Sequence, residues 1–108
     1  NMESTLSYII IPMLKQLKET KHGSPSVDDT DVPKGLRSTS VPEKENEGDI
    51  DDNWHDRWDW VLDEMIWAFE QINEDWELTK EKNGKEAHDT RMKRGFTFFG
   101  KYYQDLWD

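Results

Sequence analysis

The apolar positions of this chain fall at helical spacing in three stretches, and the middle stretch has the clearest pattern. Over about residues 52–76 they share one arc of a helical wheel, at about 100° per residue, which predicts a helix with one core-facing side. Asp51 and Asp52 suit the start of this helix by charge and by capping. The arc consists of Trp54, Trp58, Val61, Leu62, Met65, Phe69, Ile72 and Trp76.

The flanking stretches predict two further helices, over about residues 5–20 and 89–107. In the first, Pro12 either starts the helix or kinks it. In the second, Gly95 and Gly100 lower helix propensity, so they either admit a neighbouring backbone closely or break the segment near Gly100. The spaced apolar residues are Leu6, Ile10, Met13, Leu14 and Leu17 in the first, and Met92, Phe96, Phe99, Tyr103 and Leu106 in the second.

Helical periodicity is lost over residues 21–51, where Pro, Gly and acidic residues dominate. Because long irregular loops are uncommon inside compact domains, this segment is either a mobile acidic linker or a functional loop that wraps the core. The whole pattern predicts an all-α fold: a single small three-helix domain with a long acidic loop between the first two helices. The apolar anchors available to the loop are Val27, Val32, Leu36, Val41 and Ile50.

Composition narrows the class of protein. Hydrophobic residues make up 33% and charged residues 35% of the 108 residues, yet six Trp, four Phe and three Tyr exclude full disorder. Cysteine is absent, which excludes disulfides, thiolate zinc sites and Cys nucleophiles and suits a reducing cytoplasm. The sequence contains no run of about 18 apolar residues, so it predicts no membrane span. The apolar residues 6–14 lack the basic leader and the cleavage site of a signal peptide.

The formal net charge of −10 changes the choice of partner. A charge of this sign repels phosphates, which argues against general nucleic-acid binding and favours a basic protein partner. Asp52, Asp56, Asp59 and Asp63 step along the second helix beside His55, and pairs of such acids on two helices can hold Mg²⁺. The second acidic helix is missing, so a solvated acidic face is the favoured interpretation. No nucleophile elbow, phosphate-binding loop or zinc motif occurs, and we expect no metal or cofactor.

Trp60 and Trp67 lie seven residues apart, nearly opposite the core face of the second helix, among acids. Three explanations are open: the third helix or the loop covers this second apolar face, a second subunit covers it, or a ligand stacks on it. We expect a subunit interface or an interface-lined pocket that also includes Glu64 and Gln71, and hence a homo-oligomer.

Basic residues cluster against the acidic background and suggest an anion site. Arginine binds two phosphate oxygens at once, and an aromatic ring can stack on a base. A phosphorylated, nucleotide-like ligand would therefore fit a pocket built from these residues. The alternative is that the cations pair with acids of the other helices. The candidate ligand-binding residues are Lys21, His22, Arg57, Arg91, Arg94, Lys101 and Tyr102.

Residues 10–18, 21–23, 58–70 and 100–107 together resemble small acidic proteins encoded by tailed bacteriophages. The resemblance implies a viral protein acting in the bacterial host cytoplasm, and it carries no activity or site residue. We expect a non-catalytic binding protein that antagonises host defence by sequestering a nucleotide-derived signal. The alternatives are an acidic protein–protein inhibitor or DNA mimic of a host enzyme, and a Mg²⁺-dependent nucleotide hydrolase that would use Asp59 and Asp63.

Overall fold

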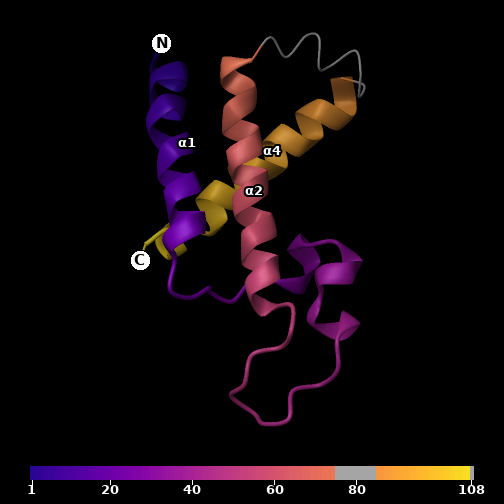
Figure 1. Ribbon diagram of the computed structural model, residues 1–108. Coiled ribbons are helices and arrows are strands. Elements are labelled where there is room, and N and C mark those ends of the chain that lie inside the picture. The colour runs from indigo at the N-terminus through magenta and orange to yellow at the C-terminus, as the bar shows by residue number, and fades with distance from the viewer. Residues whose placement is uncertain (75–84, 108) are drawn as a thin grey trace.

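The computed structural model describes residues 1–74 and 85–107, and its main elements are three helices (Figure 1). These are α1 (Met2–Thr20), α2 (Trp54–Asn73) and α4 (Lys85–Lys101). No strand occurs in the described part of the chain, so the predicted all-α class is confirmed. No helix within these residues is long and apolar enough to cross a membrane.

The first helix begins earlier than its apolar pattern predicted. The Asn1 side chain accepts a hydrogen bond from the Ser4 amide at 2.8 Å, and this cap starts α1 at Met2. Pro12 lies inside α1 on an exposed side and does not start the helix. The predicted start near residue 5 was therefore late by one turn, because capping comes from a polar residue outside the apolar stripe.

The ends of the other two helices also differ from the prediction. Helix α2 ends at Asn73, and Trp76 lies outside the described residues. Helix α4 begins four residues before Asp89 and ends at Lys101, where a single 3₁₀ turn, Tyr103–Asp105, follows. The predicted continuous helix to residue 107 is wrong, because α4 ends just after Gly100. The alternative expectation, a break of the segment near Gly100, is confirmed.

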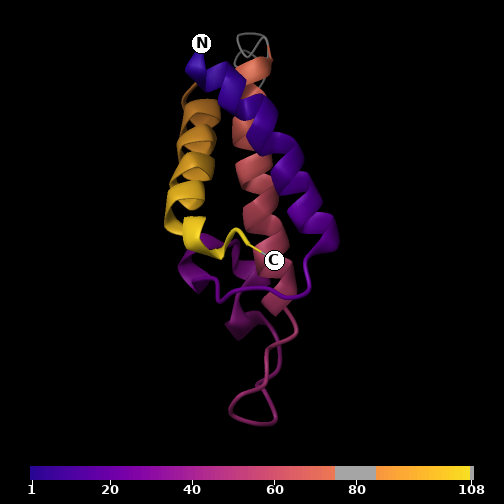
Figure 2. The same ribbon diagram turned by 90° about the vertical axis from the view of Figure 1, so that its left-hand side faces the viewer.

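Helix α2 is the centre of the fold, because α1 packs on one of its sides and α4 on another (Figures 1 and 2). Five of the eight residues of the predicted arc are buried, which confirms the core face; Trp54 and Ile72 are only half-buried. Residues from α1, the following segment and α4 complete the core. The buried cluster comprises Leu14, Val27, Val32, Trp58, Val61, Leu62, Met65, Ile66, Phe69, Phe98 and Tyr102.

One glycine sets the distance between α2 and α4. A Cβ atom on Gly95 would lie 2.5 Å from the Ala68 Cβ and 2.6 Å from the backbone oxygen of Glu64. Both are far inside normal contact distances, so the two helices approach each other through a position without a side chain. A Cβ on Gly100 would meet nothing within 4 Å. Close approach is thus confirmed at Gly95 only.

The segment between α1 and α2 folds against the lower end of α2 and then extends beyond it (Figure 1). It contains three 3₁₀ helices, Asp29–Asp31, Lys34–Leu36 and Ser38–Ser40. Val27 and Val32 are buried in the core cluster, whereas Ile50 is exposed. The contacts of these two valines favour a wrapping loop over a linker for the first half of the segment.

Candidate functional site

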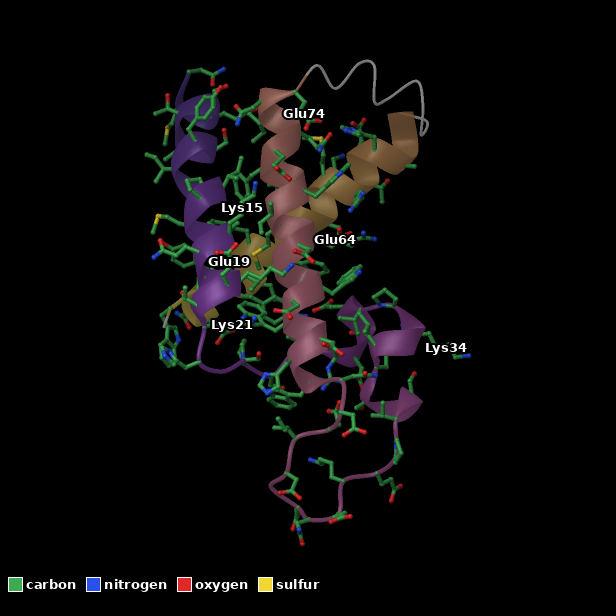
Figure 3. The ribbon with its side chains drawn as sticks, in the orientation of Figure 1. Lys15, Glu19, Lys21, Lys34, Glu64 and Glu74 are labelled. Atoms are coloured by element: carbon green, nitrogen blue, oxygen red, sulfur yellow. The ribbon has the colours of Figure 1, made fainter. Side chains whose placement is uncertain are left out.

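A row of ion pairs closes one edge of the α1–α2 contact. Three lysines spaced by three residues on and just after α1 each reach a carboxylate of α2, and Figure 3 shows Lys15 and Lys21 on the side of α1 that faces α2. The pairs are Lys15–Glu70 at 3.4 Å, Lys18–Asp63 at 2.8 Å and Lys21–Asp59 at 2.6 Å. Asp59 and Asp63 are therefore engaged by lysines. Within residues 1–74 and 85–107 no three His, Asp or Glu side chains gather as a metal site.

Glu64 holds the two arginines that we expected to bind an anion. Its side chain is 6% exposed, on the α2 side that faces α4, and it accepts a hydrogen bond from Arg91 Nη2 at 2.7 Å and another from Arg94. Figure 3 shows Glu64 on this side of α2. Burial alone raises the pKa of Glu64, but the two arginines outweigh burial and hold it below its ordinary value. Both guanidinium groups are thus already paired with a buried carboxylate, while the arginine side chains stay 43% and 42% exposed.

Helix α4 covers the second apolar face of α2. Trp60 packs edge-on against Phe98, and the Arg94 guanidinium lies 5.2 Å from its ring centre. Trp67 packs against the ring of His88, and the Arg91 guanidinium lies 4.0 Å from the Trp67 ring centre. Such contacts are favourable cation–π pairs. The intramolecular alternative therefore accounts for both tryptophans.

Two of the expected interface residues are buried within the chain. Glu64 is 5% exposed and lies under the two arginines of α4. Gln71 is 3% exposed, and its side-chain oxygen lies 2.9 Å from a ring nitrogen of His88. Neither side chain can contact a second molecule without separation of α2 and α4.

Two of the expected ligand-binding residues are also buried. Arg57 is 3% exposed and forms a two-pronged ion pair with Asp51, at 2.8 and 2.6 Å. Tyr102 is 4% exposed, and its hydroxyl donates to Asp31 at 2.6 Å. Desolvation, followed by that hydrogen bond, raises the pKa of Tyr102 to about 12. Both residues tie the segment after α1 to the helices, and both are already bound to acids of this chain.

The remaining cations are not brought together into one pocket. Lys101 binds two acids of the segment after α1, Asp28 at 2.7 Å and Asp31 at 2.6 Å. Lys21 lies on the α1 side of α2, and His22 is exposed in the turn that follows it. The alternative interpretation of the basic residues, in which they pair with acids of other elements, describes the structure best.

An acidic groove with charged walls lies beside the start of α2. It encloses about 880 Å³ between residues 26–29, residues 38–47 and the start of α2. Two basic residues line the groove: Arg57, which is paired with Asp51, and Lys44, which is exposed. The acids that line it are Asp28, Asp29, Glu43, Glu45, Glu47 and Asp51.

The sequence shows that acidic residues dominate this segment, but its pattern did not predict that they form a site. The signal was the run Glu43, Glu45 and Glu47 with Lys44 as its only base, and all four side chains are exposed. Asp49, Asp52 and the first acid of α2, Asp56, are exposed as well, beyond the groove wall. The list of acids was visible in the sequence, whereas the concave shape depends on the path of the segment.

The carboxylates held by these contacts predict how stability depends on pH. Hydrogen bonds from Ser38 lower the pKa of Asp29, and Arg57 lowers that of Asp51. The pKa of Glu64 is lowered as described above. A carboxyl whose pKa is lower in the folded state stabilises the fold above its unfolded-state pKa of about 4. That contribution is lost as the pH falls through the folded-state pKa.

We therefore expect the urea midpoint of unfolding to stay level between about pH 7 and pH 5 and to fall below about pH 4. Tryptophan fluorescence measures it. A parallel series at high salt screens the general repulsion among exposed charges, so the fall that persists reports the buried pairs. A midpoint that rises on acidification would mean that repulsion within the −10 chain outweighs these pairs.

No protein-family model, no curated protein and no solved structure matches this chain.

Proposed function

We propose that this chain is a non-catalytic binding protein whose acidic groove takes a basic segment of a partner protein. The observation that carries the proposal is the imbalance of free charge at the groove. Glu43, Glu45 and Glu47 are exposed on its wall, and Lys44 is the exposed base beside them. The other basic residue of the lining, Arg57, is already paired with Asp51. A lysine or arginine of a partner would find carboxylates there that form no ion pair with a cation of residues 1–74 or 87–107.

The ion pairs of the other cations favour one of the two binding functions expected from the sequence over the other. Sequestering a nucleotide needs free cations, but Lys21, Arg91 and Arg94 are each held by a carboxylate of α2. An acidic inhibitor needs free carboxylates on a surface of complementary shape. Electrostatic complementarity of this kind mainly raises the association rate and selects the partner. The geometry supports the inhibitor more than the nucleotide binder.

The chemistry of the partner follows from the spacing of the acids. Exposed carboxylates along an irregular segment resemble the row of phosphates on a nucleic acid, so the fitting partner is an enzyme with a basic nucleic-acid-binding surface. The resemblance to phage proteins suggests a bacterial host for that enzyme, and this part of the proposal rests on the resemblance alone.

A capture experiment with charge-matched variants tests this function. We expect the immobilised chain to retain a stoichiometric protein from a bacterial lysate, released by salt and by competing duplex DNA. The variant Glu43→Gln, Glu45→Gln, Glu47→Gln should bind the purified partner at least about tenfold more weakly, because lost charges at an interface slow association. The matched control removes the same charge elsewhere, at the exposed residues Glu3, Glu19 and Glu74.

Three outcomes would contradict the proposal. Equal loss of binding in the two triple variants would show that net charge alone matters. Capture that resists salt would exclude an electrostatic contact. A small nucleotide released by heat from the purified protein, with no captured protein, would favour the signal-sequestering function instead.

A further inference from the structure

Helix α1 carries an exposed apolar stripe on the side away from α2. Met2, Leu6, Ile9 and Met13 are 77%, 41%, 52% and 65% exposed, and they follow one another at spacings of four, three and four. This is the spacing at which helices pack along a shared seam. Six of the eight exposed large apolar side chains in the described part of the chain belong to this stripe or follow α4. Exposed apolar surface gathered on one face indicates association.

The stripe leads into an apolar groove between α1 and the residues that follow α4. The groove encloses about 620 Å³, and Met13 belongs both to the stripe and to its wall. Tyr103 and Trp107 form part of the opposite wall and are 63% and 73% exposed. Figure 2 shows the chain after α4 turning toward α1. A ridge and a hollow thus lie side by side on one face.

The charge on this face identifies the partner that it fits. Residues 1–20 contain two lysines and two glutamates, so their net charge is zero, although the whole chain carries −10. Two copies repel each other on most approaches, and they meet the least repulsion where α1 faces α1. A basic partner would be drawn to the acidic groove, which shares no lining residue with this face.

We propose that this face binds a second copy of the chain, with the two α1 helices antiparallel about a two-fold axis. An axis midway between residues 7 and 8 places Leu6 opposite Ile9 and Met2 opposite Met13. The partner's Met2 then enters the groove beside Tyr103, and the same contact repeats on the other side. Such a contact is closed and uses one patch twice, as symmetric dimers do.

The area on offer is of the size that a dimer needs. The four stripe residues with Tyr103 and Trp107 expose on the order of 600 Å². The walls of the groove add to this, and specific interfaces bury about 800 Å² on each partner. The proposal does not depend on the proposed acidic inhibitor function, because the two surfaces are separate.

Light scattering or sedimentation of matched variants tests the dimer. We expect wild-type protein to have twice the chain mass of 12.9 kDa. Leu6→Glu with Ile9→Glu should give the mass of one chain with unchanged far-UV helicity. Thr5→Glu with Tyr8→Glu adds the same charge to exposed positions of the same turns off the stripe and should remain dimeric.

Cross-linking checks the register, and the absence of native cysteine makes it specific. A Leu6→Cys chain mixed with an Ile9→Cys chain should form a disulfide faster than either variant alone. A wild-type mass of one chain at about 100 µM, well above the micromolar Kd of weak interfaces of this size, would overturn the proposal. Equal dissociation of the two glutamate variants, or no faster cross-linking in the mixture, would also overturn it.

Discussion

Replacing Gly95 with alanine is expected to lower the free energy of unfolding by about 2 kcal/mol. The new methyl group would lie 2.6 Å from the backbone oxygen of Glu64 and 2.5 Å from the Ala68 Cβ, so α2 and α4 would have to separate. Overpacking of this kind costs about 1–3 kcal/mol, and the backbone oxygen cannot rotate away. The gain of about 1 kcal/mol in helix propensity offsets only part of the cost.

The other glycine of α4 is the matched control for this change. Nothing lies within 4 Å of a Cβ on Gly100, so Gly100→Ala should keep or raise stability by up to about 1 kcal/mol. Urea unfolding followed by tryptophan fluorescence measures both variants. Equal effects of the two alanines would show that helix propensity, and not contact between α2 and α4, decides the outcome.

Removing the Arg57 side chain while leaving Asp51 in place is expected to cost about 3–5 kcal/mol, because a buried charge loses its partner. Arg57 and Asp51 side chains are 3% and 8% exposed and share two hydrogen bonds. Arg57 also donates to the carbonyl oxygen of Leu36 at 3.2 Å, so the change releases the 3₁₀ turn there. Arg57→Met, measured by urea unfolding, tests this cost.

The double variant Arg57→Met with Asp51→Leu separates the cost of an unpaired charge from the loss of a contact. Replacing both ions with apolar groups of similar size is often close to neutral. We therefore expect the double variant to be more stable than Arg57→Met alone, with a clear coupling between the two sites. Additive losses would mean that the carboxylate of Asp51 is solvated and that the pair contributes little.

The core of the bundle was predictable because periodicity reports burial directly. Trp58, Val61 and Leu62 recur with Met65 and Phe69 on one arc, and all five are buried. The pattern also showed that α2 is apolar on a second side, at Trp60 and Trp67. It did not show what covers that side, because the position of α4 depends on contacts between residues about thirty apart, above all at Gly95.

The charged part of the site was the least predictable. Acidic and basic side chains are almost always exposed, so no local pattern marks Glu64 or Arg57 as buried. Each becomes buried only when its partner arrives from another element. Lys101 stays exposed, but its partners also come from another element, because Asp28 and Asp31 of the segment after α1 raise its pKa. A sequence lists the charges, but the choice of partners is made by the fold.

The unequal attachment of α1 and α4 has a consequence for how the molecule opens. Helix α4 is interlocked with α2 at Gly95 and through buried Glu64, whereas α1 adds surface lysine pairs, each worth at most about 1 kcal/mol, to one apolar face. Local unfolding of α1 should therefore cost less than global unfolding. Because α1 also carries the proposed dimer face, its folding is thermodynamically linked to protein concentration, and dilution alone would loosen it.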